Sequence, residues 1–270
     1  MGGSLDTPVE AHGHLWFKRD DLFELSGMYG AKVRACLALC ERAKNQGYTR
    51  VVSAGSRYSP QLAILGTVAN HLGLKAVGIT AKGESLPFIQ QAESLGVEVH
   101  KIPYGYTNVI HKRARDFADA LGAYLVPFGM RDDLSVYLTA ESFVRSFEGS
   151  DVLGKIKRLV VAAGSGVNLA GSLTGMRLTH ISTLPVLAVL VGHDCREFVY
   201  KRCPWVYHWD NISFVRAGLG YKELSLFNQV NGISVDSRYE GKAVMFLEEG
   251  DLFWLIGKAV SSPVVISREV

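Results

Sequence analysis

Short apolar runs alternate with amphipathic stretches along most of the chain. The runs are typical of buried strands, and the stretches between them repeat apolar residues about every 3.6 positions, as helices do. The predicted strands are 51–55, 76–80, 97–102, 124–127, 159–163 and 186–191. The predicted helices are 59–72, 87–95, 107–121 and 134–147. This alternation predicts an α/β fold with open parallel sheets, in which ligands bind beyond the carboxyl ends of the strands.

One lysine stands where it could serve as a covalent anchor. Lys32 ends the run Gly30-Ala31-Lys32, after the segment 18–22 (Lys-Arg-Asp-Asp-Leu) and just before a helical pattern. A lysine amine at the floor of a site forms Schiff bases with carbonyl compounds such as pyridoxal phosphate. A solvated lysine in the first turn of a helix is the alternative, and Lys32 alone favours that alternative, because surface lysines far outnumber catalytic ones.

A glycine-rich loop follows the predicted strand 159–163. It reads Gly-Ser-Gly-Val-Asn-Leu-Ala-Gly over residues 164–171 and leads into a helical pattern. Glycines let the backbone approach an anion closely, and the N–H groups at a helix N-terminus favour negative charge. The loop fits neither a Walker A motif nor a true GxGxxG, so a plain strand-to-helix turn stays open beside a phosphate cradle.

A third segment, 236–242, reads Asp-Ser-Arg-Tyr-Glu-Gly-Lys. Taken in order with Gly30-Ala31-Lys32 and the loop 164–171, it resembles the tryptophan-synthase-β-like (fold type II) enzymes that depend on pyridoxal phosphate. The resemblance is greatest to their branch of 1-aminocyclopropane-1-carboxylate (ACC) deaminase and D-cysteine desulfhydrase. Thr7-Pro8 before segment 18–22 is also similar to that branch. The resemblance covers most of 7–175 and 217–245.

The resemblance implies an α/β fold of two open parallel-sheet, three-layer domains, with the active site in the cleft between them. Residues 1–45 and 146–270 would form the larger cofactor-binding domain, and 46–145 a smaller inserted one. The implied cofactor is pyridoxal 5'-phosphate, and the implied substrate is a small amino acid.

The resemblance also implies roles for individual residues. Lys32 would form the Schiff base and then serve as a base, and Glu240 would face the pyridine nitrogen. Ser59 would bind the substrate carboxylate, although it is equally an ordinary helix N-cap, and Glu240 could be a surface carboxylate after a turn. The candidate catalytic residues are Lys32, Ser59, Tyr239 and Tyr221. The candidate cofactor-binding residues are Lys32, Gly164, Ser165, Gly166, Val167, Asn168 and Glu240.

Some positions depart from the family pattern. Pro60 stands where an asparagine would bond the phenolic oxygen of the cofactor, and proline has no side-chain donor. Ala31 also replaces an asparagine. The stretch 176–215 is much shorter than in the family, so we expect a homodimer whose contact includes Trp205 and Trp209. A lyase or deaminase, a β-replacement transferase, and a degenerate binding or scaffold protein all stay open as functions.

Composition narrows the functional classes. The chain has 270 residues, 48% of them hydrophobic, and a net charge of +3, which gives no reason to expect nucleic acid as a partner. The basic run 111–115 falls on a predicted helix and is most simply a solvated face. No apolar run reaches the roughly 18 residues of a membrane span, and we expect a cytosolic enzyme. His193, Cys195, Cys203 and His208 match no zinc signature, so no metal is expected.

Overall fold

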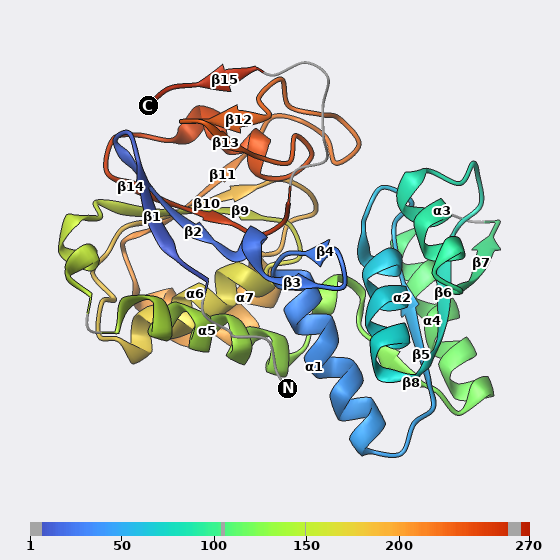
Figure 1. The fold of residues 1–270 in the computed structure, drawn as a ribbon. Coiled ribbons are helices and arrows are strands. Elements are labelled where there is room, and N and C mark those ends of the chain that lie inside the picture. The colour runs from blue at the N-terminus through green and yellow to red at the C-terminus, as the bar shows by residue number, and fades with distance from the viewer. Residues whose placement is uncertain (1–6, 104–105, 149, 259–265) are drawn as a thin grey trace. The chain divides into compact units, whose positions relative to one another are not determined.

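The computed structural model describes residues 7–103, 106–148, 150–258 and 266–270. The chain forms two compact units (Figure 1). The first unit contains Met1–Phe23, Tyr29–Ala31 and Ser135–Val270, and the second contains Glu24–Met28 and Lys32–Leu134. The division predicted from the resemblance, 1–45 with 146–270 against 46–145, differs in placing residues 24–28 and 32–45 with the larger part and residues 135–145 with the smaller one, and it stays a prediction.

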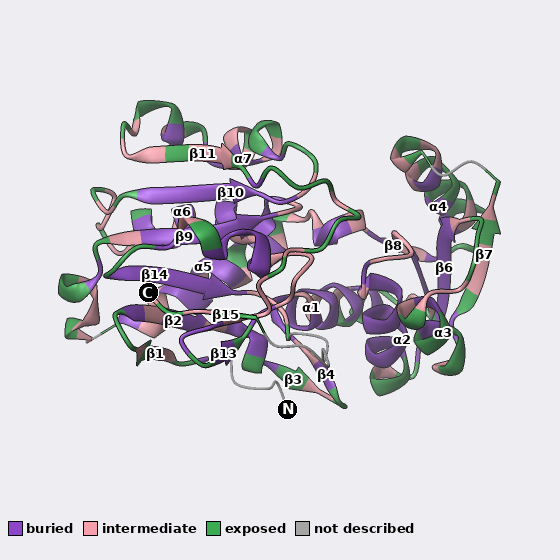
Figure 2. Ribbon diagram, turned by 90° about the horizontal axis from the view of Figure 1, so that it is seen from above, coloured by how far each residue is buried: buried purple, intermediate pink, exposed green. Residues whose placement is uncertain are grey.

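A six-stranded sheet is the centre of the first unit. Its strand order is β1-β2-β14-β9-β10-β11. Only β1 and β2 run antiparallel; each of the other neighbouring pairs is parallel. The strands are β1 (Val9–His12), β2 (Leu15–Arg19), β9 (Arg158–Ala163), β10 (Val186–Leu190), β11 (Ile212–Arg216) and β14 (Asp251–Leu255). The inner strands β14, β9 and β10 are buried, whereas β11 is partly exposed at the edge (Figure 2).

Side chains of this sheet alternate between two covered faces, because successive residues of a strand point to opposite sides. Leu159 and Val161 of β9 share one hydrophobic cluster with residues of α5 (Asp133–Phe147), α6 (Val167–Leu178) and α7 (Arg196–Arg202). Val160 of β9 belongs to the opposite cluster, with residues of the C-terminal segment 230–247. The sheet is therefore the middle of three layers.

Two glycines let α5 and α6 pack closely. A Cβ at Gly171 would lie 2.3 Å from Cβ of Thr139, and one at Gly175 would lie 2.6 Å from Cβ of Phe143. Any larger side chain at these positions would push the helices apart. The last glycine of the loop 164–171 is therefore a packing residue.

The third layer of the first unit contains short elements. Its small sheet has the order β13-β12-β15. These strands are β12 (Gln229–Val230), β13 (Ile233–Ser234) and β15 (Ser267–Arg268), and they are accompanied by 3-10 turns at Glu240–Lys242 and Val244–Phe246. Val230, Ile233 and Val244 bury their side chains against the central sheet.

The second unit has a four-stranded parallel sheet of order β7-β6-β5-β8. Val52 and Ala54 of β5 pack with α4 on one face. Ser53, which points the other way, accepts a hydrogen bond from Gln61 of α2. The elements are α1 (Ala31–Asn45), β5 (Arg50–Ala54), α2 (Gln61–Leu72), β6 (Lys75–Ala81), α3 (Pro87–Ser94), β7 (Glu98–Ile102), α4 (Thr107–Leu121) and β8 (Tyr124–Val126), with the hairpin β3 (Glu24–Leu25) and β4 (Met28–Tyr29) before them.

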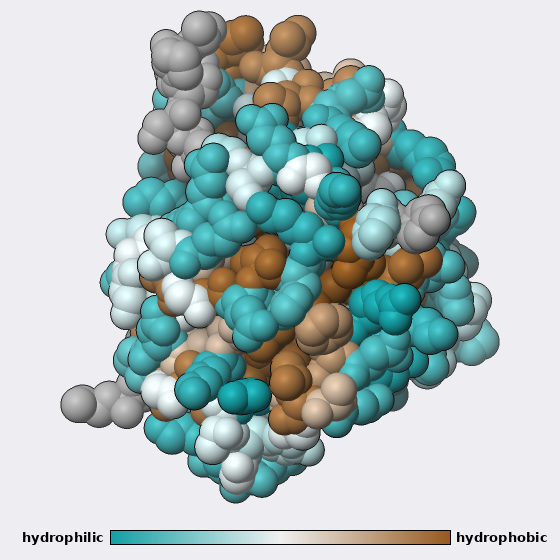
Figure 3. Space-filling model, turned by 90° about the vertical axis from the view of Figure 1, so that its right-hand side faces the viewer, coloured by the Kyte–Doolittle hydropathy of each residue, from teal (hydrophilic) through white to brown (hydrophobic). Residues whose placement is uncertain are grey.

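Figure 3 shows the side of the molecule where β7 and α3 of the second unit lie in Figure 1. Apolar side chains appear there between hydrophilic ones, as is usual on the surface of a globular protein. Among the described residues, no helix combines the length and the apolar character that crossing a membrane requires.

Candidate active site

The carboxyl edge of the central sheet in the first unit gathers several predicted residues. Since β14, β9 and β10 are parallel, the segments after them leave the sheet at one edge. Ile256-Gly257 follows β14, the loop from Gly164 follows β9, and Val191-Gly192 follows β10. This is the edge where open α/β sheets bind ligands.

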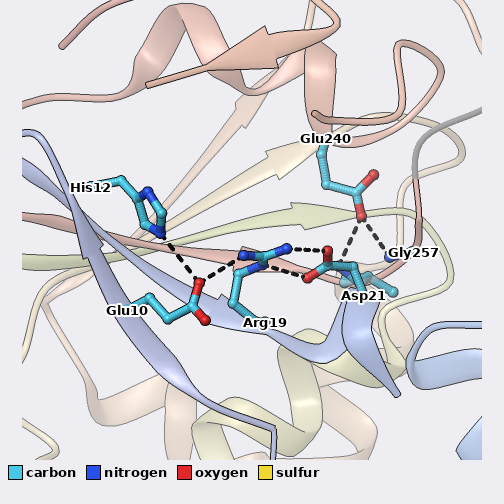
Figure 4. A network of polar contacts seen from close by, with 7 residues as sticks. Glu10, His12, Arg19, Asp21, Glu240 and Gly257 are labelled. Carbon is cyan, nitrogen blue, oxygen red and sulfur yellow. Dashed lines mark hydrogen bonds and ion pairs between the residues drawn. The ribbon is translucent and has the colours of Figure 1, made fainter. Parts of the chain in front are cut away.

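Glu240 is a buried carboxylate at this edge, with a relative exposure of 2%. Its Oε1 accepts hydrogen bonds from the backbone N–H groups of Ile256 (3.0 Å) and Gly257 (3.3 Å), as Figure 4 shows. Its Oε2 is buried and has no hydrogen-bond partner among the described residues. Buried polar atoms are normally paired, so this oxygen is suited to a donor that comes from outside the chain.

The protonation of Glu240 is strongly perturbed. Burial raises the pKa of its carboxyl to about 8, with a further increase from Asp236, although the N–H donors act in the opposite direction. At neutral pH the carboxyl therefore holds a proton unless a positive group faces it. A cationic N–H opposite Oε2 would favour the ionised form.

Ile256 links Glu240 to the backbone before Lys32. The Ile256 carbonyl accepts a hydrogen bond from the N–H of Ala31 (2.8 Å), and Lys32 is the next residue, in the first turn of α1. Gly30 has φ +109°, and a Cβ there would lie 2.6 Å from the Ile256 oxygen. The turn before Lys32 therefore requires glycine, and it is held by the same dipeptide that binds Glu240.

Two tyrosines form a pair at the same edge. The hydroxyls of Tyr221 and Tyr239 lie 2.9 Å apart in a hydrogen bond. A Cβ at Gly164 would lie 3.9 Å from the Tyr239 ring, and one at Gly192 would lie 3.6 Å from the Tyr221 ring. The pair thus lies against the loops that follow β9 and β10.

Basic residues of segment 236–242 hold Tyr221 in place. Nζ of the buried Lys242 donates to the Gly220 carbonyl (2.7 Å), and Arg238 donates to the carbonyl of Lys222 (2.8 Å). Burial lowers the pKa of Lys242, and Arg238 adds to this effect. These two side chains therefore fix the backbone on both sides of Tyr221.

The glycine-rich loop has the geometry of a helix start. Gly166 has φ +88° at the N-cap of α6, which begins at Val167. A Cβ on Gly166 would also meet Cβ of Cys195 at 3.0 Å. Nδ2 of Asn168, in the first turn of α6, is buried without a hydrogen-bond partner among the described residues. The loop combines helix N–H groups with an amide donor that has no acceptor in the described part of the chain.

Ser59 lies in the second unit, two residues before α2. Its Oγ accepts a hydrogen bond from Gln61 N (3.3 Å), and its hydroxyl can still donate. The N-cap of α2 is Pro60, without a side-chain cap bond, so Ser59 is not the N-cap that the sequence offered as an alternative. Gln61 Oε1 in turn accepts from the N–H of Gly129 (2.7 Å), and its Nε2 donates to Pro127 O (3.1 Å). The buried Gln61 thus fixes the loop at 127–130, where Met130 has φ +55°.

Segment 18–22 forms a buried polar network. Lys18 and Asp20 are 0% exposed, and Lys18 Nζ lies 3.1 Å from Asp20 Oδ1. Thr7 bonds both, and Trp254 Nε1 donates to Asp20 Oδ2 (3.1 Å). Every oxygen of Asp20 has a partner, so this part of the motif joins β2 to β14.

A second network beside it is partly exposed. Arg19 donates to both oxygens of Asp21 (2.9 Å each) and to Glu10 (2.7 Å), and Glu10 contacts His12 (3.2 Å), as Figure 4 shows. Burial raises the pKa of Asp21 despite its pairing with Arg19. Residues 18–21 therefore contribute structure around the candidate site.

The structure brings together Gly164, Tyr221, Tyr239 and Glu240 in the first unit. Lys32 directly follows Ala31, whose N–H bonds the Ile256 carbonyl, but Lys32 is counted in the second unit. Ser59 also belongs to the second unit. Ile256 and Gly257 were not predicted from the sequence. The apolar run 252–256 before Gly257 is the signal that could have revealed them, as a strand followed by a turn. Among the described residues, no group of three or more His, Cys, Asp or Glu side chains is placed to hold a metal ion.

Two proteins, one from Pyrococcus horikoshii and one from Thermotoga maritima, are similar to this chain in sequence. A protein of Pyrococcus horikoshii named "Putative 1-aminocyclopropane-1-carboxylate deaminase" is 28% identical over 189 residues, which cover 68% of this chain and 57% of the relative. A protein of Thermotoga maritima with the same name is 29% identical over 66% of this chain and 58% of its own length. The matched part thus spans less than two thirds of each relative.

Solved structures share the fold. A crystal structure described as an ACC deaminase homologue has a TM-score of 0.79 at 23% identity, covering 93% of this chain and 89% of its own. The crystal structure of a threonine deaminase from T.th. has a TM-score of 0.68 at 18% identity, covering 95% and 94%. The predicted fold class is confirmed. The family described as "Pyridoxal-phosphate dependent enzyme" matches residues 4–204.

Proposed function

Since the chain belongs to the family of pyridoxal-phosphate-dependent enzymes, we propose that it is a lyase or deaminase acting on a small amino acid, with Lys32 as the amine that binds the cofactor. The family, the cofactor and the dependence on pyridoxal phosphate, all expected from the sequence, are confirmed by this match. The chain spans about 57% of the length of the curated relatives, and the reaction itself belongs to the proposal.

One observation carries the proposal. The buried Oε2 of Glu240 lacks a partner among the described residues, and Oε1 is fixed by Ile256 and Gly257. A carboxylate of this kind fits the protonated nitrogen of a pyridine ring, which supplies its missing donor. When bound, pyridoxal phosphate withdraws electrons from the Cα of an amino acid and so permits carbanion chemistry. Glu240 would keep the proton on the ring nitrogen, which strengthens that withdrawal.

The remaining predicted residues take supporting roles. The backbone N–H groups of residues 164–168 would hold the phosphate at the start of α6, and the Asn168 Nδ2, unpaired among the described residues, is suited to one of its oxygens. The amine of Lys32 would carry protons at the substrate Cα. The hydroxyls of Tyr221 and Tyr239 are hydrogen-bonded to each other. A proton that one hydroxyl gives up can therefore be replaced by the proton of the other.

Ser59 would bind the substrate carboxylate through its hydroxyl, as the resemblance implies. Pro60 leaves the phenolic oxygen of the cofactor without the usual side-chain donor. The proposal also includes a cytosolic location and a homodimer with Trp205 and Trp209 at its contact. Light scattering tests the dimer, and a strict monomer at working concentration would contradict it.

Borohydride reduction tests the anchor. The purified protein should be yellow, and reduction followed by peptide mass analysis should place the cofactor on Lys32. Lys32→Ala should abolish the label, because no other amine occupies that position. Lys44→Ala is the matched control, since Lys44 lies on the same helix and bonds only the Leu72 carbonyl in the described part of the chain. A colourless protein, or a label on another lysine, would overturn the proposal.

The reaction class needs a separate assay. A panel of small amino acids should release ammonia and a 2-oxo acid, including the ring-opened product from ACC. Turnover that requires a second nucleophile would assign the chain to the β-replacement transferases instead. A yellow protein without turnover of any kind would favour a binding or scaffold role.

A further inference from the structure

A surface pocket of the first unit lies away from the candidate active site. Its volume is about 400 Å³, and its lining residues are Arg177, His180, Ser182, Trp205, His208 and Trp209. Arg177 is in the last turn of α6, and residues 180–182 lead into β10 while Trp209 precedes β11. The pocket therefore lies toward the amino ends of β10 and β11, at the sheet edge opposite to Glu240.

The charges in the pocket have one sign. The Arg177 guanidinium lies over the Trp205 ring, 4.4 Å from its centroid. Arg177 is exposed and forms no ion pair within the described part of the chain, and none of the lining residues is acidic. A guanidinium stacked on an indole still presents its N–H groups at the edge, where they can bind a carboxylate.

A second donor in the pocket wall lacks an acceptor. Nε1 of Trp205 is buried and has no hydrogen-bond partner among the described residues. A buried indole N–H usually finds an acceptor, and leaving it unpaired is costly. An acceptor oxygen brought by a ligand would satisfy it.

The aromatic lining of the pocket also favours a planar ligand. Trp205 and Trp209 supply aromatic surface on the same pocket that holds two imidazoles. The volume lies at the lower end of the range for small-molecule sites, about 300–1,000 Å³. An aromatic ring of a ligand can stack on the two indoles. The Arg177 guanidinium and the Trp205 N–H are donors that favour a negatively charged group on that ligand.

We infer that this pocket binds a small aromatic anion, a planar ring that carries a carboxylate. The carboxylate pairs with Arg177 and accepts from the Trp205 N–H, and the ring lies against the indoles. Because the pocket is at the far edge of the sheet from Glu240, its occupant is an effector or a second ligand and takes no part in the reaction. The inference does not depend on the proposed reaction, but it requires that the homodimer contact proposed above leave the pocket side of Trp205 and Trp209 open to the ligand.

Isothermal titration calorimetry of the cofactor-loaded protein tests the inference with three probes: 1-naphthoate, the neutral 1-naphthamide and inorganic phosphate. We expect one naphthoate per chain and at least tenfold weaker binding of both other probes. Arg177→Gln should weaken naphthoate about tenfold or more, because it removes a charge-assisted hydrogen bond. Trp205→Phe, which keeps a ring and removes the N–H, should weaken it about fivefold.

Lys201→Gln is the matched control, since it removes an exposed positive charge from the neighbouring helix α7 and should leave affinity unchanged. Melting curves and cofactor absorbance show whether each variant is folded and loaded. Equal binding of the amide, equal binding of phosphate, or an Arg177→Gln protein with unchanged affinity would each overturn the inference. So would a dimer in light scattering whose formation excludes naphthoate, because a second copy would then occupy the pocket.

Discussion

Two buried carboxylates of the first unit, Asp20 and Glu240, lie in opposite chemical situations. Asp20 is paired on both oxygens, by Lys18, Thr7 and Trp254. Glu240 is equally hidden from solvent, but among the described residues only its Oε1 is paired. A satisfied carboxylate holds elements together, whereas a half-satisfied one costs stability and is kept where a ligand can complete it. Burial alone therefore does not distinguish a structural acid from a functional one.

Removing the partner of Asp20 should have the largest effect. Lys18→Met leaves a buried charge uncompensated, which costs about 3–5 kcal/mol of the free energy of unfolding. Urea denaturation measures this loss. Lys44→Met, at an exposed lysine bonded to the Leu72 carbonyl, should change stability by less than about 0.5 kcal/mol. A Lys18→Met protein as stable as that control would show that Asp20 does not depend on its ion pair.

Glu240 should make the cofactor-free protein less stable as pH rises. Its pKa is about 8 when folded against 4.5 as the ordinary value, so between these values only the folded state holds the proton. The contribution of Glu240 to stability is therefore complete below about pH 4.5 and is lost as the pH rises toward about 8. Glu240→Gln removes this part of the slope, because its amide does not titrate.

Urea unfolding of the wild type and of Glu240→Gln at several pH values tests this prediction. The difference between their free energies of unfolding belongs to Glu240, because other titrating groups, such as Asp21, are the same in both proteins. Bound cofactor should flatten the wild-type curve, since a ring nitrogen proton opposite Oε2 favours the ionised carboxyl. The same slope in wild type and Glu240→Gln would remove Glu240 from the explanation.

Gly30→Ala should have the smallest of the three effects, about 1–3 kcal/mol. The new Cβ would be both strained at φ +109° and only 2.6 Å from the Ile256 oxygen. Gly27→Ala is the matched control, with φ +81° and open space around the new Cβ. Chemical denaturation should show a larger loss at position 30, and equal losses would mean that the contact with Ile256 adds nothing to the backbone strain.

The periodic part of the fold could be predicted from the sequence. The helix predicted at 107–121 is α4 (Thr107–Leu121), ended by Gly122 in a left-handed conformation, and the predicted strands match β5 to β10 within about two residues at their ends. The strands β11 and β14 were not predicted. A short apolar run such as 252–256 is ambiguous, because a strand and a buried helix share that pattern.

The candidate site was only partly predictable. The residue types at 32, 164–168 and 236–242 pointed to the family, because their order along the chain is specific. The hydrogen bonding of Glu240 could not be predicted. Its donors are the N–H groups of Ile256 and Gly257, which follow the strand β14. The roles of Lys32, Ser59, Tyr221 and Tyr239 stay predictions.

The dipeptide at the end of β14 has a mechanical consequence. Its two amide hydrogens meet one oxygen of Glu240, and its first carbonyl meets the amide that precedes Lys32. The acid that would set the electronic state of the ring and the amine that would tether it therefore share a single backbone support. A displacement of Glu240 would therefore act on the backbone that leads into Lys32.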